Sequence, residues 1–248
     1  MSGHSHAKNV MFKKTKANAA RSKLFSKLAR EIIVASKAGL PDPDHNARLR
    51  TAVVAARAQS VPRDGIERAI KKGQGGDAEN YDEIRYEGYG PGGVALIVEC
   101  LTDNRTRTAA DVRAAFSKFG GVMGETGSVG FMFSRNGVIT YPLAKGSADD
   151  MLEVALDVGA DEVDTDDEEH EFRCSLENFT AVRDALEAKL GPAASSGLYF
   201  RPQTTNLVPD NVGETLVKLL ETLDDDDDVQ RVTGNYELSE ALMAKLGE

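Results

Sequence analysis

The sequence predicts a multidomain α+β protein with an N-terminal three-helix domain and two ferredoxin-like α/β domains, one inserted in the other. Two observations lead to this fold class. The first 72 residues are basic, helical periodicity begins at about residue 18, and a glycine-rich polar segment at 73–80 ends that pattern. From Gly137 onward, strand-like and helix-like segments follow in the order β-α-β-β-α-β, which is the split βαβ arrangement. With 248 residues, the chain can form one to three domains.

The N-terminal domain is expected to contain three helices. The first, at 18–38, places its apolar residues within one arc and its cations on the opposite side. The second, at 44–59, begins with Asp44 as its N-cap, and the third, at 62–73, ends at Gly73. The cations on the polar side of the first helix, which we expect to form an exposed row, are Lys23, Lys27, Arg30 and Lys37.

Strands and helices alternate in the rest of the chain. The predicted strands are 81–89, 94–101, 128–134, 137–141, 198–207 and 229–236. The predicted helices are 108–119, 148–158, 176–190 and 211–223, with an acidic hairpin at 162–175 and a charged turn at 224–228. The predicted domains are therefore 1–78 (basic and helical, with a flexible arm at 1–20), a discontinuous α/β domain at 79–135 and 207–248, and an inserted ferredoxin-like α/β domain at 136–206.

Charge is distributed unevenly along the chain. The net charge is −10, yet residues 1–72 hold 16 Lys and Arg against 5 Asp and Glu, a net of +11. Residues 73–248 hold 14 against 35, a net of −21. Such a reversal predicts a basic module that meets a polyanion, joined to acidic domains.

The candidate nucleic-acid-binding residues are the cations of the basic module. They are Lys8, Lys13, Lys14, Lys16, Arg21, Lys23, Lys27, Arg30, Arg63, Lys71 and Lys72, with Arg105 and Arg107 as secondary candidates. Their excess of lysine favours phosphate contact over bidentate base recognition. For Lys71 and Lys72 a structural role is equally open, because cations stabilise a helix C-terminus. The acidic stretches 164–171 and 224–228 are expected to be solvated surface.

Other classes of function find little support in the residues. The glycines at 88–93 lack the Gly-Lys-Ser/Thr of a phosphate-binding loop, so we expect a tight turn there. The sequence shows no nucleophile–base pair and no metal-ligand spacing. We therefore predict no enzyme activity, no metal or cofactor, and no obligate small-molecule ligand. Cys100 and Cys174 are expected to be reduced and buried. The longest apolar run is far shorter than a membrane helix, and a cytoplasmic protein without a membrane partner is expected.

Several motifs closely resemble those of the YebC/PmpR family. They are Ile66-Glu-Arg-Ala-Ile-Lys-Lys-Gly73, Tyr86-Glu-Gly-Tyr-Gly-Pro-Gly-Gly-Val94, Val98-Glu-Cys-Leu-Thr-Asp-Asn-Arg105, Gly3-His-Ser5, and Asp42-Pro-Asp44 followed by Asn46-Ala-Arg-Leu-Arg50. The resemblance covers essentially the whole chain. One departure is that the family commonly has Lys-Trp after Gly-His-Ser, whereas this chain has His6-Ala7 and no tryptophan.

The resemblance implies a three-domain cytoplasmic protein with a role in gene expression. Members are commonly labelled as probable transcriptional regulators that bind DNA. Relatives include a mitochondrial translational activator of cytochrome c oxidase, and bacterial members are connected with ribosomes stalled on proline-rich sequences. The predicted function is thus a nucleic-acid-binding regulator, with DNA named first. The alternative is a ribosome-associated translation factor that binds ribosomal or transfer RNA. Asp64 and Glu67 on the third helix would repel phosphates, which weighs against sequence-specific groove reading.

Overall fold

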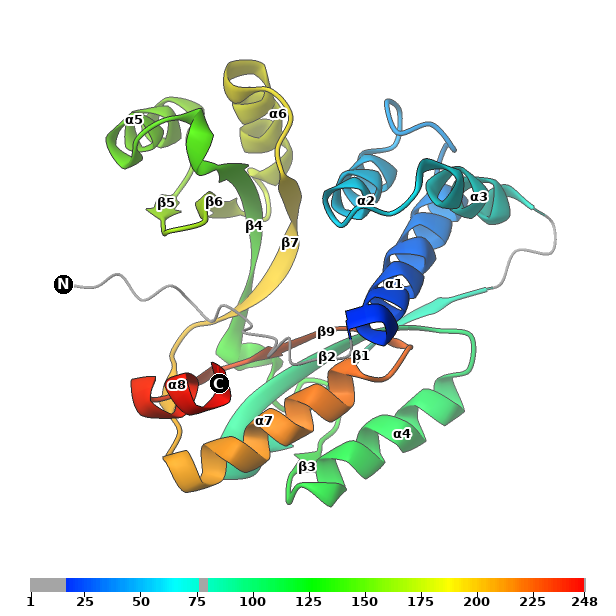
Figure 1. Cartoon of the computed structure of the whole chain (residues 1–248), viewed down its shortest axis with the longest axis vertical. Helices are drawn as coiled ribbons and strands as arrows, with labels where there is room; N and C mark the ends of the chain where they lie inside the picture. The colour runs from blue at the N-terminus through cyan, green and yellow to red at the C-terminus, as the bar shows by residue number, and fades with distance from the viewer. Residues whose placement is uncertain (1–16, 76–79, 248) are drawn as a thin grey trace.

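The structure, a computed structural model, describes residues 17–75 and 80–247 (Figure 1). It is an α+β fold in which N-terminal helices precede two four-stranded sheets and one two-stranded sheet, so the predicted fold class is confirmed. The helical domain contains α1 (Ala17–Ala38), α2 (Ala47–Ala58) and α3 (Arg63–Gln74). Its core consists of the residues that the helical periodicity places inward, including Ile32, Leu49, Val53, Ile66 and Ala69.

The N-cap of α2 differs from the prediction. Asn46, not Asp44, caps the helix, and its Oδ1 accepts a hydrogen bond of 3.1 Å from the Leu49 amide. Asn46 Nδ2 donates to the carbonyls of Ala35 and Leu40, so one side chain ties together the end of α1 and the start of α2. Asp44 is instead held in a tight turn, where its amide donates to Asp42 Oδ1.

Gly73 does not end α3, which continues to Gln74. It is the point where α3 lies closest to α1, because a Cβ added at Gly73 would sit 2.6 Å from the Ile33 carbonyl oxygen. Ser36 Oγ donates to the Ile70 carbonyl at the same crossing. The glycine at 73 therefore serves helix packing rather than helix termination.

The first sheet belongs to the discontinuous part of the chain. Its strands are β1 (Asp82–Gly90), β2 (Val94–Thr102), β3 (Val122–Met123) and β9 (Val229–Gly234), in the order β3-β1-β2-β9. One face is covered by α4 (Arg105–Lys118) and α7 (Asp210–Asp224), which pack on alternate residues of β2. The β1–β2 connection is a short 3₁₀ turn, η1 (Pro91–Gly93), with Gly92 and Gly93 at positive φ, so the predicted tight turn is present.

The second sheet lies in the sequence between β3 and β9. Its strands are β4 (Phe133–Pro142), β5 (Glu162–Thr165), β6 (Glu169–Ser175) and β7 (Ser195–Pro202). With α5 (Ala148–Val158) and α6 (Phe179–Leu190), their order β5-β6-β4-β7 is that of a ferredoxin-like domain. In the first sheet, β3, β1, β2 and β9 take the places of β5, β6, β4 and β7. The two sheets therefore have the same arrangement, except that β1 comes before β2 in the chain instead of after β3. We call the part formed by 133–202 the inserted domain.

Short elements complete the fold. They are η2 (Gly130–Met132), η3 (Leu143–Lys145), β8 (Asn206–Leu207), β10 (Tyr236–Glu237) and α8 (Glu240–Gly247). Figure 1 shows the helical domain and the inserted domain side by side above the first sheet. They also touch, since β7 contacts α2, and Thr51 Oγ1 lies 3.4 Å from Ser196 Oγ. None of the described helices combines the length and apolar character needed to cross a membrane.

The strand predicted at 128–134 is wrong. The amides of Val129 and Gly130 donate to the buried carboxylate of Glu87, at 2.9 and 2.7 Å, instead of joining a ladder. A continuous β4 then replaces the predicted break before Gly137. Gly137 allows Phe179 and Cys174 to pack closely against β4, because a Cβ at this position would lie 2.4 Å from Phe179 Cδ2 and 2.8 Å from Cys174 Sγ. Both cysteines are free and buried, as predicted, and burial raises the pKa of Cys174 to about 11.

Candidate nucleic-acid interface

The cations of α1 meet the acidic loop, residues 224–228, which connects α7 to β9. Lys23 Nζ lies 3.0 Å from Asp225 Oδ1 and 2.9 Å from the Asp225 carbonyl oxygen. One turn further, Lys27 Nζ lies 2.9 Å from Asp224 Oδ1 and 2.6 Å from the Asp224 carbonyl oxygen. The side chain of Lys27 is only 11% exposed, so this contact is part of the domain interface.

Arg30 lies at the centre of the same interface. Its Nη1 donates to Asp228 Oδ1 and to the Leu101 carbonyl, both at 3.0 Å, and also to the Asp227 carbonyl. The guanidinium carbon is 4.9 Å from the centre of the Tyr81 ring, a cation–π distance. Arg30 thereby connects α1 to the acidic loop, to the end of β2 and to the residue before β1.

Asp228 is the common acceptor of this network and is 4% exposed. Its Oδ2 accepts from Arg107 Nη2 at 2.6 Å, from Thr108 Oγ1 at 2.7 Å and from Thr102 Oγ1 at 3.0 Å. Burial alone would raise the pKa of Asp228, but these hydrogen bonds outweigh it and hold the pKa below its usual value. Asp228 is therefore an ionised buried carboxylate with all its partners in place.

Two predictions are corrected here. Lys23, Lys27 and Arg30 do not form an exposed cationic row, and the acidic loop is not simply solvated surface. The reason is that the sequence separates the two charged segments by about 200 residues, whereas the fold pairs them. Lys37, the fourth member of the predicted row, is exposed and donates to Asn80 Oδ1.

A groove of about 610 Å³ opens beside this network. Its cations are Lys23, Arg30 and Arg107, and its carboxylates are Asp103, Asp111, Asp225, Asp226, Asp227 and Asp228. Carboxylates outnumber cations, and each cation is already bonded to a carboxylate. This groove is poorly suited to phosphate. In the described ranges, no group of three or more His, Cys, Asp or Glu side chains is placed to hold a metal ion.

The other predicted residues lie on different surfaces. Arg63 is exposed and paired with Glu67 at 2.7 Å, Arg21 lies over the Phe25 ring, and Lys71 and Lys72 are exposed on α3. Of the secondary candidates, Arg105 is exposed, with Asp82 at 3.8 Å, and Arg107 is held by Asp103 and Asp228. Lys8, Lys13, Lys14, Lys16 and most of the predicted flexible arm lie outside the described residues.

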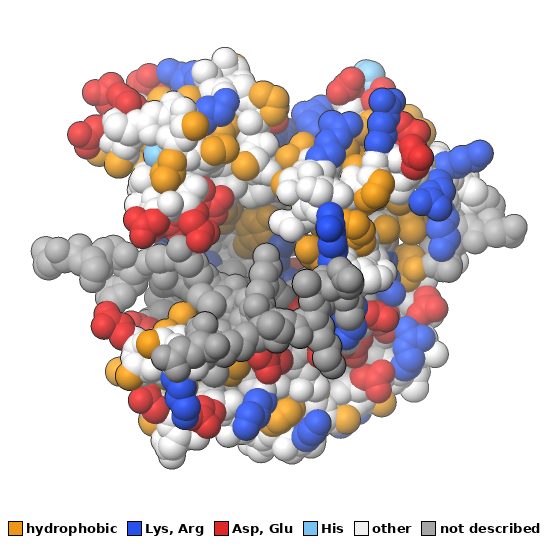
Figure 2. Space-filling model, in the orientation of Figure 1, with side chains coloured by type: hydrophobic (Ala, Val, Ile, Leu, Met, Phe, Trp, Pro, Cys, Tyr) orange, Lys and Arg blue, Asp and Glu red, His pale blue; other side chains and the backbone are white. Residues whose placement is uncertain are grey.

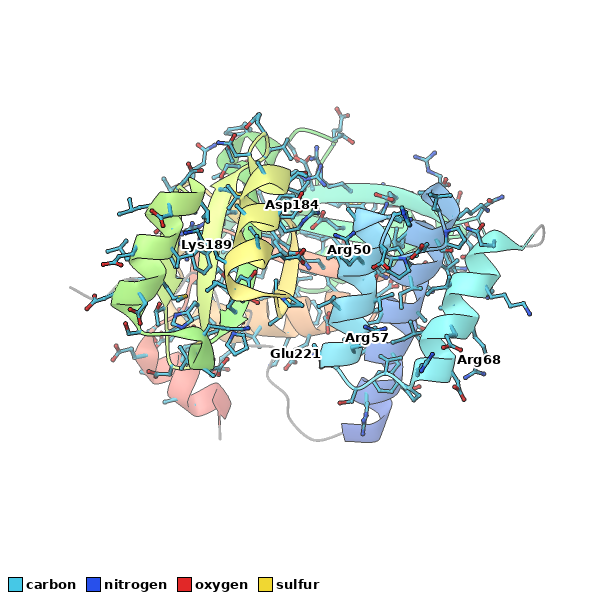
Figure 3. The ribbon with its side chains drawn as sticks, turned by 90° about the horizontal axis from the view of Figure 1, so that it is seen from above. Arg50, Arg57, Arg68, Asp184, Lys189 and Glu221 are labelled. Atoms are coloured by element: carbon cyan, nitrogen blue, oxygen red, sulfur yellow. The ribbon has the colours of Figure 1, made fainter. Side chains whose placement is uncertain are left out.

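The structure adds two cations that the sequence analysis did not select. Arg57 is exposed in the last turn of α2, and Arg68 is exposed on α3, where its Nε donates to the carbonyl of Asp64. In Figure 3, Arg68 lies on the side of the helical domain that faces away from the inserted domain, and Arg57 lies at the end of α2. Figure 2 shows Lys and Arg side chains gathered over the helical domain. Helical spacing was a usable signal, since positions 57, 68 and 71 all fall outside the buried stripes.

The fold and this surface together define a three-domain α+β protein whose basic helical domain is fixed by its first helix to an acidic, interrupted α/β domain. The protein-family model described as the TACO1/YebC protein N-terminal domain matches residues 5–76. The model described as the TACO1/YebC second and third domain matches residues 81–236. The chain belongs to the TACO1/YebC family, as the motifs suggested. It is also similar to the crystal structure of a conserved hypothetical protein from Aquifex aeolicus, with 41% identity, 93% of this chain and 97% of that chain covered, and a TM-score of 0.82.

Proposed function

We propose that this protein is a regulator of gene expression that binds nucleic acid through the outer surface of α2 and α3. The observation that carries the proposal is the exposed position of Arg57, Arg68 and Lys71, which form no ion pair with a carboxylate within the described chain. Lys23, Lys27 and Arg30 of α1 are already paired with the acidic loop, whereas the cations of α2 and α3 named above remain accessible. The N-terminal lysines add to that charge in the sequence.

Two kinds of nucleic acid are candidates. The family model over the two α/β domains is named for transcriptional regulation, which supports DNA. The chemistry of α3 supports structured RNA, because Arg63 is paired with Glu67, and Asp64 is exposed beside them. A helix with this mixture of charges would contact phosphates from its edge and gain little from insertion into a major groove. RNA binding would fit a translation factor associated with the ribosome.

A salt titration tests the proposal. The test variant carries Arg57→Glu, Arg68→Glu and Lys71→Glu, and the matched control carries Arg113→Glu, Lys118→Glu and Lys218→Glu on α4 and α7. All six side chains are exposed. Each variant replaces three cations with glutamate, so both change the net charge by the same amount. Each lost phosphate contact should flatten the plot of log affinity against log salt by roughly 0.7–0.9. We expect a flatter slope for the test variant only, and an equal effect in both variants would contradict the proposed surface.

The same titration distinguishes the two nucleic acids. A DNA duplex and an RNA duplex of equal length and matched sequence would be titrated side by side with the full chain. Tighter binding of the DNA duplex supports the transcriptional role, and tighter binding of the RNA duplex supports the translational role. Co-sedimentation with ribosomes that is lost on RNase treatment would be the cellular counterpart of the second result.

A further inference from the structure

A second polar surface lies on the face of the first sheet that α4 and α7 leave uncovered. At one end of this face, Val129 and Phe133 pack over Ala95 and Ile97. At the other end, α1 approaches through the bond from Arg30 to the Leu101 carbonyl. Glu99 lies on the same face of β2 as Ala95 and Ile97, because every second residue of a strand points to the same side, and it lies between the two covered ends. Figure 2 shows the surface hollowed between the inserted domain and the helical domain, above this sheet.

Glu99 is flanked by arginines on both neighbouring strands. The register pairs Glu99 with Arg85 on β1 and with Arg231 on β9. Even so, within the described part of the chain the Glu99 carboxylate has no hydrogen bond and no ion pair within 4 Å. Burial raises its pKa, although Arg231, Arg135 and Arg85 act in the opposite direction. A carboxylate this enclosed usually has a hydrogen-bond or ion-pair partner, so the absence of one at Glu99 requires an explanation.

The arginines around Glu99 are stacked on aromatic rings. The guanidinium carbon of Arg231 lies 3.8 Å from the centre of the Tyr199 ring. Those of Arg85 and Arg135 lie 5.2 and 5.8 Å from the centre of Phe200. Stacking fixes the plane of a guanidinium and leaves its N–H edges available. Among the described residues, Arg135 and Arg231 have no carboxylate partner. Arg85 Nη2 lies 2.9 Å from Glu87 Oε1, whereas Arg85 Nε is buried without an acceptor.

These six residues, Arg85, Glu99, Arg135, Tyr199, Phe200 and Arg231, form what we call the arginine–aromatic site. They come from both sheets, so the site exists only when the inserted domain lies against the first sheet. Positively charged planar groups suit a phosphate and a stacked base. An enclosed carboxylate suits the N–H donors on the edge of an unpaired base. A nucleotide supplies all three kinds of group in one ligand.

We propose that the arginine–aromatic site binds an unpaired guanine nucleotide, with Glu99 accepting from the base and the arginines holding the phosphate. Guanine fits best because its N1–H and N2–H groups lie side by side and match the two oxygens of a carboxylate. Uracil offers a single N–H between two carbonyl oxygens, which would face the carboxylate unfavourably. The site thus deepens the proposed function, on which it rests for the strand that supplies the nucleotide.

The test compares two single-stranded RNA octamers, one of uridines only and one with a single central guanosine, by fluorescence anisotropy with the full chain. Free guanosine monophosphate is used as a competitor. The variants are Glu99→Gln and Arg135→Ala, with Arg113→Ala as the control for an exposed arginine on the opposite side of the sheet. A bidentate contact discriminates by about 1–3 kcal/mol, so we expect roughly 5- to 150-fold tighter binding of the guanosine octamer.

Glu99→Gln should abolish this preference while leaving affinity for the uridine octamer nearly unchanged, which a purely structural role of Glu99 would not produce. Arg135→Ala should weaken both octamers, and Arg113→Ala neither. If guanosine monophosphate competes, the nucleotide alone is sufficient for binding. If it does not compete, the nucleotide must be part of a strand. Either result supports the site if the preference depends on Glu99. Equal affinity for both octamers, or a preference retained in Glu99→Gln, overturns it. Failure of the α2–α3 surface would instead appear as an unchanged salt slope on duplexes.

Discussion

Arg30 and Asp228 are 198 residues apart in the chain and form a buried ion pair with a 3.0 Å contact. Their side chains are 16% and 5% exposed. The pair fixes the helical domain to the first sheet, and Arg107, Thr102 and Thr108 complete the bonding of the carboxylate. Asp228 therefore helps to fix the position of the basic surface relative to the α/β domains, together with the pairs that Lys23 and Lys27 form with the acidic loop.

Replacing Asp228 with asparagine should destabilise the protein by about 2–4 kcal/mol. The substitution keeps the shape of the side chain but leaves Arg30 and Arg107 without their shared anion in a buried position. Urea unfolding followed by circular dichroism measures the change. Asp225→Asn is the matched control, because Asp225 is 76% exposed and its pair with Lys23 should contribute less than about 1 kcal/mol. Equal losses in the two variants would show that burial of Asp228 has no particular weight.

Acid should weaken the same interface between the helical domain and the first sheet. Because the pKa of Asp228 is lowered in the folded state, its contribution is complete above the unfolded value of about 3.9 and is lost as pH falls through the folded pKa. The free energy of unfolding should therefore decrease as pH falls below about 4, and the decrease should be smaller in Asp228→Asn. Urea titrations at a series of pH values provide the comparison. Identical pH profiles for the variant and the parent protein would refute the assignment.

Glu87 should control the order of the loop that precedes β4. Its buried carboxylate accepts from the amides of Val129 and Gly130, and these bonds, together with one from Gly127, outweigh burial and lower the pKa of Glu87. Glu87→Gln replaces one acceptor oxygen with a donor and should cost about 1–3 kcal/mol. Faster hydrogen exchange at the amides of Val129 and Gly130 is the specific readout. Glu125→Gln, at an exposed position of the same loop, should leave both exchange rates unchanged.

Gly73 should not tolerate a methyl group. In Gly73→Ala the new Cβ would overlap the Ile33 carbonyl oxygen and Ser36 Cβ, so α3 would move away from α1 at a cost of about 1–3 kcal/mol. Gly75→Ala is the control, since its Cβ would meet its nearest neighbour at an ordinary 3.6 Å. Thermal unfolding of the two variants tests the difference. A stabilised Gly73→Ala variant would mean that helix propensity outweighs the close contact.

The sequence was sufficient where local signals and tertiary contacts agree. The helix at 148–158 was predicted with its observed bounds, because Ser147 forms a capping box with Asp150 and Gly159 ends the helix in the left-handed region. The hairpin at 162–175 also followed from local patterning. The break predicted between the strands 128–134 and 137–141 is absent, because Gly137 makes room for Phe179 within one long strand.

The candidate site was predicted less completely, for a physical reason. Periodicity shows which cations share a helix face but gives no information about what the fold places against that face. Lys27 and Arg30 therefore seemed exposed, although the acidic loop covers them. The same reasoning applies to Glu99, because its neighbours Arg135 and Arg231 lie on strands far away in the sequence. Long-range charge pairing has no periodicity, so it becomes visible only in three dimensions.

The inserted domain leaves and rejoins its host through two strands that lie against each other, with Phe133 opposite Pro202 in the antiparallel register of β4 and β7. A segment whose two ends lie side by side can be inserted into a host chain with little change to the host, because the host residues that flank it are already close together. The host sheet is complete without it, since among the described residues β1, β2, β3 and β9 pair only with one another. The molecule is thus organised as a host body and an inserted domain whose two ends adjoin, and the inserted domain carries half of the arginine–aromatic site.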